Sequence, residues 1–160
     1  MVVAVENTSS LYFIFALALV TLSVVLIPRE DYRLFLPVLF IGTLVHAGLL
    51  YTSINIVGAW QYAQAEPLAV FGIPIFILIA WGAALALFLW GLPEGLPRWA
   101  HYVYIGSFAL AGTIIDSTFH SVGLRLYSQW YSGWMWFFPL FFIFWLTYSI
   151  YMKRMGLERI

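Results

Sequence analysis

Residues 100–123, AHYVYIGSFALAGTIIDSTFHSVG, form a long apolar run that contains Asp116 and His120. A helix crosses the hydrocarbon core of a bilayer with about 20 residues at ~1.5 Å rise each, so this run is long enough to span. Asp116 and His120 are four residues apart and share one helix face. An Asp at the centre of a membrane helix costs roughly 2.5–3.5 kcal/mol, so it usually faces the protein interior and has a partner. The run therefore predicts a membrane helix with a polar face.

The composition of the whole chain is typical of an integral membrane protein. Of the 160 residues, 64% are hydrophobic and 9% are charged, whereas soluble domains carry about 25% charged residues. The net charge is zero, so nothing indicates a nucleic-acid partner. Cysteine is absent, which excludes disulfides, thiolate metal sites and cysteine nucleophiles. The beginning of the chain, MVVAVENTSS, has no basic n-region, so we expect no cleavable signal peptide.

Hydropathy divides the chain into five apolar spans. They cover about residues 10–27, 34–57, 67–90, 100–123 and 132–152. The intervening loops are short, so consecutive helices are expected to be antiparallel neighbours. We therefore expect an all-α integral membrane protein, in which residues 1–160 form a single bundle of five transmembrane helices.

The basic residues predict the orientation of this bundle. Only Arg125 lies on one side of a five-span topology, and the other Lys and Arg residues lie on the opposite side: Arg29, Arg33, Arg98, Lys153, Arg154 and Arg159. Cytoplasmic loops are enriched in Lys and Arg, which places the N-terminus outside and the C-terminus in the cytoplasm. We expect a multi-pass protein of the bacterial cytoplasmic (inner) membrane.

A weak internal repeat is visible at an offset of 65 residues. Its matches include Val57-Gly58 with Val122-Gly123, Tyr62 with Tyr127, and Pro74 with Pro139. Under this interpretation the second and third helices are a parallel repeat of the fourth and fifth, related by an axis along the membrane normal. Asn55 then stands opposite His120. Chance matches in so biased a composition are the alternative.

The polar residues of the second and fourth spans predict the candidate site. Asp116 lies roughly 10 Å and His120 roughly 5 Å below the outer end of the fourth helix. His46 is nearer the middle of the second span, and Asn55 is near its outer end. We predict an outward-opening pocket between these two helices, with Asp116 and His120 as its polar anchor. His46 and Asn55 are second ligand contacts. In the structural alternative, Asp116 and His120 satisfy each other and a nearby Ser or Thr and so fix helix packing, and His46 is a structural hydrogen-bonding residue.

Simple counts exclude several cofactor classes. The single lysine, Lys153, is at the cytoplasmic end, so a retinal Schiff base within the bundle is excluded. His46 and His120 differ in depth by ~12 Å, which disfavours a haem ligated by both. The spans contain one carboxylate, whereas a di-iron bundle needs several. We expect no cofactor, no metal and no catalytic residue.

Two family resemblances follow from specific runs of residues. Asn55-Ile-Val-Gly58-Ala-Trp60-Gln-Tyr62 with Phe71-Gly-Ile-Pro74, and Asp116-Ser-Thr-Phe-His120-Ser-Val-Gly123 with Tyr127, resemble helices two to five of an uncharacterised membrane protein family of spore-forming Firmicutes, known by a clostridial locus tag. The resemblance implies a five-helix fold with an acidic residue at the position of Asp116. More distantly, the Gly-x-Trp-x-Tyr and Gly-x-Pro pattern is similar to carotenoid cyclase and hydratase membrane proteins. Those cyclases carry Pro-x-Glu-Glu where this chain has Pro74-Ile-Phe-Ile, so their acid chemistry does not carry over.

Three classes of function are compatible with these observations. The leading hypothesis is a non-catalytic membrane protein that binds a lipid or isoprenoid-like ligand, or serves as a subunit or accessory of a larger membrane complex. Its partners would be membrane lipids, a small apolar ligand, and a membrane protein or a second copy of the chain. The alternative is an enzyme that uses Asp116 and His120 for acid–base chemistry on a polyprenoid. The third is a component of a proton or cation pathway.

Overall fold

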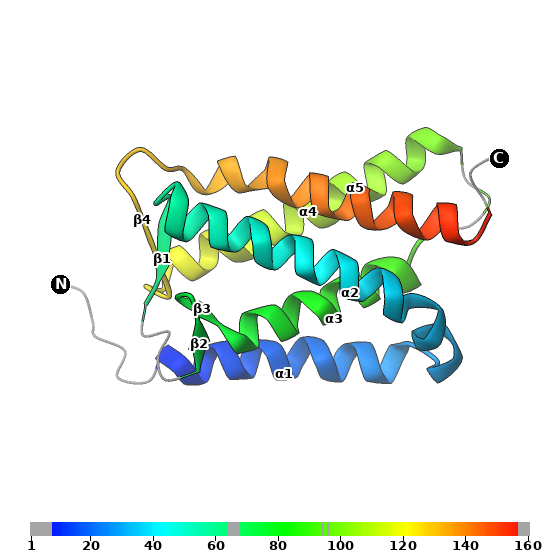
Figure 1. The fold of residues 1–160 in the computed structure, drawn as a ribbon, viewed down its shortest axis with the longest axis horizontal. Coiled ribbons are helices and arrows are strands. Elements are labelled where there is room, and N and C mark those ends of the chain that lie inside the picture. Colours follow the sequence, from blue (N-terminus) through cyan, green and yellow to red (C-terminus); the bar gives the residue numbers. More distant parts are fainter. Residues whose placement is uncertain (1–7, 64–67, 94, 96, 157–160) are drawn as a thin grey trace.

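The computed structural model describes residues 8–63, 68–93, 95 and 97–156. Residues 1–7, which belong to the stretch on which the signal-peptide prediction rests, lie outside this range, as do residues 64–67, where the third span was expected to begin. The described chain is mostly helical, which confirms the helical class (Figure 1). Its α-helices are α1 (Thr8–Leu26), α2 (Arg29–Tyr51), α3 (Ile75–Trp90), α4 (Arg98–Ser121) and α5 (Phe137–Arg154).

Helix α2 begins before the expected apolar span because its first turn is polar but well suited to a helix start. Pro28 is its N-cap residue, and Glu30 and Asp31 lie in the first turn, where the helix dipole favours acidic side chains. At its other end the helix widens into the π-helical turn η1 (Thr52–Ile56), in which the N–H of Val57 donates to the carbonyl of Thr52 at 2.9 Å. Helical structure therefore extends close to the predicted end of the second span.

The third helix begins later than predicted. Strands β2 (Ala69–Val70) and β3 (Ile73–Pro74) form a hairpin, and α3 starts directly after it. The two turn residues, Phe71 and Gly72, have φ values of 54° and 77°. Positive φ at both central residues is what a type I′ hairpin turn requires, and Gly72 adopts it without steric cost. The prediction of helix over residues 69–74 was wrong because hydropathy does not distinguish this turn from a helical turn.

Two further strands join the two halves of the chain. Strand β1 (Trp60–Tyr62) pairs antiparallel with β4 (Arg125–Tyr127), with Gln61 opposite Leu126. Each strand follows a helix and a glycine with positive φ, at 64° for Gly58 and 78° for Gly123. Gln61 and Leu126 are 65 residues apart, the same offset as the sequence repeat. We call this end of the bundle the strand end.

The helices pack in the order α1, α3, α2, α5, α4, with a further contact between α3 and α5. Helix α2 packs against α3 and α5, α4 packs against α5, and α1 covers α3 from the outside (Figure 1). Glycines permit the closest helix contacts: a Cβ at Gly112 of α4 would stand 2.7 Å from Cδ1 of Leu140 on α5. The core lies along the bundle axis and ends, at the strand end, in the buried rings of Trp60 and Trp136.

The surface of the helices is rich in large apolar side chains, including Val25 at 73% and Phe138 at 74% exposure. By length and hydropathy, two helical stretches of the described chain qualify as membrane spans, Arg29–Ile56 and Gly133–Arg154. Ser10–Leu26 and Ile75–Trp90 are apolar but shorter, and α4 is not among the qualifying helices. The five-span topology therefore stays a prediction.

Candidate functional site

Asp116 on α4 is buried at the strand end and is paired with Arg125 of β4. One carboxylate oxygen forms an ion pair with Arg125 Nη1, and the other accepts a hydrogen bond from the hydroxyl of Tyr127 at 2.5 Å. The side chains of Asp116 and Arg125 are 5% and 2% exposed. Burying one charge alone is very costly, so each of these groups requires the other. The partner of Asp116 is therefore Arg125, and not His120 as the structural alternative supposed.

Aromatic rings enclose the guanidinium of Arg125. Its Cζ lies 4.1 Å from the ring centroid of Trp60, 4.9 Å from that of Tyr62 and 5.5 Å from that of Trp136. Nη2 also donates to the hydroxyl of Tyr62 at 2.9 Å. A desolvated cation over aromatic faces gains about 2 kcal/mol or more. The strand register places Arg125 opposite Tyr62, so the β1–β4 pairing positions the cation among these rings.

We define the Arg125 cluster as these six residues: Asp116, Arg125, Tyr127, Tyr62, Trp60 and Trp136. Burial raises the pKa of the Tyr62 and Tyr127 phenols, and the positive charge of Arg125 opposes that shift. The neighbouring Tyr131 has its pKa raised to about 12, again mainly by burial. All three phenols are therefore neutral near pH 7, so the hydroxyl of Tyr127 keeps the proton that it donates to Asp116.

His120 supports the strand rather than the carboxylate. Its ring stacks on that of Tyr127, with centroids 3.9 Å apart and planes 5° apart. Its Nδ1 lies 2.9 Å from the carbonyl oxygen of Arg125 and donates to it. The side chain is otherwise exposed. His120 thus covers the cluster from the outside and makes no hydrogen bond to Asp116 among the described residues.

The structure separates the two remaining predicted site residues. His46 is fully buried, with its ring centroid 4.4 Å from that of Trp81 and 6.1 Å from that of Trp136. Asn55 is exposed on η1, and its Nδ2 donates to the carbonyl of Phe71 at 3.0 Å. Asn55 therefore braces the β2–β3 turn and does not contribute to the Arg125 cluster, whereas His46 lies beside the cluster's Trp136.

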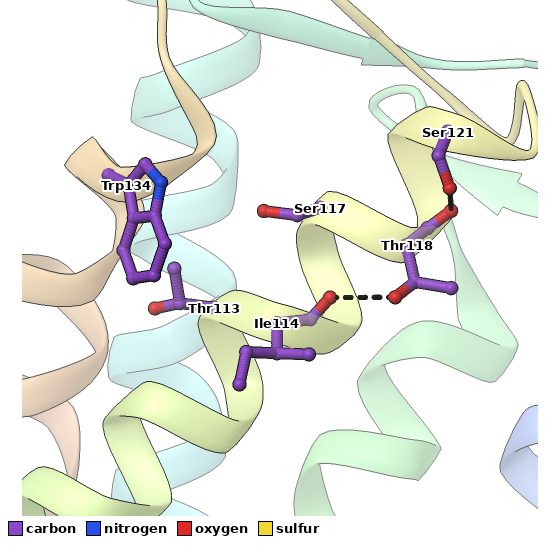
Figure 2. Close-up of a pocket in the computed structure, with 6 residues that line it drawn as sticks. All are labelled: Thr113, Ile114, Ser117, Thr118, Ser121 and Trp134. Atoms are coloured by element: carbon purple, nitrogen blue, oxygen red, sulfur yellow. Dashed lines mark hydrogen bonds between the residues drawn. The ribbon is translucent and has the colours of Figure 1, made fainter.

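A hollow of about 300 Å³ lies on α4, next to the Arg125 cluster. Trp134 of the 3₁₀ turn η2 (Gly133–Trp136) faces α4 across it (Figure 2). The lining residues are Thr113, Ile114, Ser117, Thr118, Ser121 and Trp134. The expected pocket was between α2 and α4. This hollow is instead between α4 and η2, because the aromatic rings and Arg125 fill the space on the inner side of Asp116.

Hydroxyl groups give the hollow its polar side. Those of Thr113, Thr118 and Ser121 donate to carbonyl oxygens of their own helix at 2.8–2.9 Å. Thr118 and Ser121 are exposed, so their oxygen lone pairs remain free to accept a hydrogen bond from a ligand, whereas Thr113 is fully buried. The hydroxyl of Ser117 bonds to that of Tyr127, which in turn donates to Asp116. Ser117 thus connects the hollow to the Arg125 cluster.

The sequence prediction missed Arg125, Tyr127 and Trp60. In the sequence, Arg125 is evidence of orientation and does not stand out as a site residue. Two signals were available: it is the only cation on its side of the five-span topology, and it follows Asp116 by nine residues. The part of the chain that the structure describes contains no group of three or more His, Asp or Glu side chains that could hold a metal ion.

Comparisons of the chain with family models, with curated proteins and with solved structures find no match. The two family resemblances therefore stay predictions, and the function must be argued from the geometry alone.

Proposed function

We propose that this chain is a five-helix, multi-pass protein of a bacterial cytoplasmic membrane that binds one lipid or isoprenoid-like molecule without transforming it. The binding site is the hollow between α4 and η2. The observation that carries the proposal is the position of this hollow. It opens among exposed apolar side chains, and its wall is a row of hydroxyl oxygens backed by a buried ion pair.

The chemistry of the hollow defines the ligand class. Thr113, Ser117 and Ser121 follow one another at intervals of four residues and line one face of α4. Thr113 is fully buried, but Ser117, Thr118 and Ser121 are at least partly exposed. Because these three hydroxyls offer oxygen lone pairs, they suit a head group with a hydrogen-bond donor, such as an alcohol. Ile114 and Trp134 are 54% and 63% exposed at the rim, where they can contact an apolar tail. A single neutral alcohol on a long hydrocarbon chain meets both requirements.

The geometry gives less support to the other two classes of function. Both oxygens of Asp116 are engaged by Arg125 and Tyr127, so this carboxylate is poorly placed to transfer a proton to a substrate. His120 is committed to the backbone of β4. For a cation pathway, Arg125 already neutralises the carboxylate of Asp116, so that carboxylate offers no free charge to bind a passing cation.

The test is native mass spectrometry of the protein gently extracted from its own membrane, followed by lipid extraction. Ile114→Trp should fill the hollow, and we expect it to reduce a stoichiometric bound lipid or isoprenoid alcohol at least tenfold. Leu110→Trp is the matched control, since Leu110 is exposed one turn earlier on α4 and does not line the hollow.

Equal retention of the small molecule in both variants would exclude the hollow as its site. A co-purifying membrane protein without any small molecule would instead identify the chain as a subunit of a complex.

A further inference from the structure

We propose that Ser117 makes the hollow on α4 selective for a ligand with a free hydroxyl over the same ligand with its oxygen capped or oxidised. This inference rests on the proposed function, because it concerns the ligand of the same site. It follows from the direction of each hydrogen bond in a chain that runs from the Arg125 cluster to the hollow.

The chain of hydrogen bonds begins at the carboxylate of Asp116. The ion pair with Arg125 favours the ionised form of this group, and an ionised carboxylate can only accept hydrogen bonds. The hydroxyl of Tyr127, 2.5 Å from Oδ2, must therefore donate its single hydrogen to Asp116. For any other partner, the oxygen of Tyr127 has only lone pairs left.

Ser117 is the next residue in this chain. Its hydroxyl bonds to that of Tyr127, and both oxygens lie against Gly133 of η2. A Cβ at Gly133 would stand 2.8 Å from Oγ of Ser117 and 2.9 Å from the hydroxyl oxygen of Tyr127. Because Tyr127 has already donated its hydrogen, Ser117 must be the donor in their bond. Only the lone pairs of Ser117 then remain for a ligand in the hollow, which this residue lines.

The two exposed hydroxyls of the lining are acceptors for the same reason. Thr118 and Ser121 donate their hydrogens to the carbonyl oxygens of Ile114 and Thr118, at 2.9 and 2.8 Å. Ser117 is the strongest acceptor of the three, because its own donation leads to a charged group and hydrogen bonds in such a chain polarise one another. The indole N–H of Trp134 is the one side-chain donor left among the lining residues (Figure 2).

A hydroxyl on the ligand is complementary to this wall. It can donate to Ser117 and also accept from the indole of Trp134. An ether or carbonyl oxygen can only accept, so it would place its lone pairs against those of Ser117. A phosphate group is also disfavoured, since no lining residue is charged and the guanidinium of Arg125 is buried against Asp116. The hollow therefore selects a free alcohol over its ethers, aldehydes and phosphate esters.

The test compares farnesol with farnesyl methyl ether, two probes that share a hydrocarbon chain and differ in whether the oxygen carries a hydrogen. Each probe is titrated by native mass spectrometry into the whole chain in detergent. We expect the parent chain to bind farnesol about five- to tenfold more tightly than the ether, the effect of one neutral hydrogen bond. Ser117→Ala should remove most of this preference by weakening the binding of farnesol alone.

Tyr127→Phe is the second variant, and it tests the direction of the hydrogen bonds. The phenylalanine ring can still stack on His120, but the hydroxyl of Ser117 is then free to turn and donate to the ether. Binding of the ether should therefore become stronger, a gain that damage to the fold would not produce. Ser107→Ala is the matched control and should leave the preference unchanged. Ser107 is exposed on α4, donates to the carbonyl of Tyr104 at 2.7 Å and does not line the hollow.

The possible outcomes separate this inference from the proposed function. If the parent chain bound both probes equally and Ile114→Trp lost both, the hollow would remain a ligand site and the selectivity would be overturned. A preference for farnesol that survived unchanged in both Ser117→Ala and Tyr127→Phe would also overturn it. Binding that is absent from the parent chain, or that persists in Ile114→Trp, would overturn the proposed function and this inference together.

Discussion

Replacing Arg125 by methionine should unfold the strand end, because this change leaves the buried carboxylate of Asp116 without its counter-charge. Removing one partner of a buried ion pair costs about 3–5 kcal/mol, and the total stability of a folded chain is only about 5–15 kcal/mol. Methionine retains much of the length and apolar volume of arginine, so the loss reports mainly on charge. We expect the free energy of unfolding to fall by about 3–5 kcal/mol.

The assay is denaturant unfolding of the purified protein in detergent micelles, followed by tryptophan fluorescence. Trp60 and Trp136 pack against the guanidinium and report on the cluster directly. The double variant Arg125→Met/Asp116→Asn removes both charges, and it should recover most of the loss because no unpaired charge then remains.

Arg33→Met is the matched control, since Arg33 is exposed near the start of α2. It should change the free energy of unfolding by less than about 0.5 kcal/mol. If Arg125→Met lowered the free energy of unfolding by less than about 1 kcal/mol, the carboxylate of Asp116 would not depend on Arg125 and the prediction would be refuted. A double variant in which the costs of the two single changes simply add would also refute it.

Two further predictions concern alkaline pH and helix packing. Burial raises the pKa of Tyr131 to about 12 from the 10.0 of a free phenol, so its neutral form stabilises the fold below pH 10 and this contribution is lost as the pH rises toward 12. Tyr131→Phe should therefore lose less stability between pH 10 and pH 12 than the parent chain, as circular dichroism at stepped pH can measure; an identical decline would contradict this. Gly112→Ala should destabilise by about 1–3 kcal/mol because its Cβ would overlap Leu140, whereas Gly48→Ala, with nothing within 4 Å, should be neutral or stabilising. Thermal unfolding of both variants tests this difference in stability. Equal melting temperatures would show that α4 and α5 are not closely packed at Gly112.

The helices were predictable because apolar runs of helical length dominate the sequence. The residue 100–123 span corresponds closely to α4, Arg98–Ser121. The hairpin at residues 69–74 was not predictable from hydropathy, since its residues are as apolar as the helix that follows. Its signals were local: a glycine in the turn and Pro74 immediately before α3, where a missing N–H is tolerated.

The candidate site was predictable in part. The cost of a carboxylate in an apolar helix correctly singled out Asp116 as a buried residue that needs a partner. The identity of that partner was not accessible from helical spacing, because Arg125 reaches Asp116 through a reversal of the chain after Gly123. The pairing of β4 with β1 then brings Tyr62 to Arg125 from 63 residues away. Contacts of this kind leave no periodic pattern in the sequence.

The pairing of β1 with β4 also gives the strand end a local two-fold arrangement. Antiparallel strands are paired in the same way when two identical chains form a two-fold symmetric interface. One position of each strand then lies on the two-fold axis. In the β1–β4 pair, Gln61 and Leu126 lie opposite each other at that position. Under the same offset, Arg125 corresponds to Trp60 and Asp116 to Tyr51, so the ion pair belongs to one half alone. The strand end therefore combines a symmetric backbone pairing with a charge arrangement that is not symmetric.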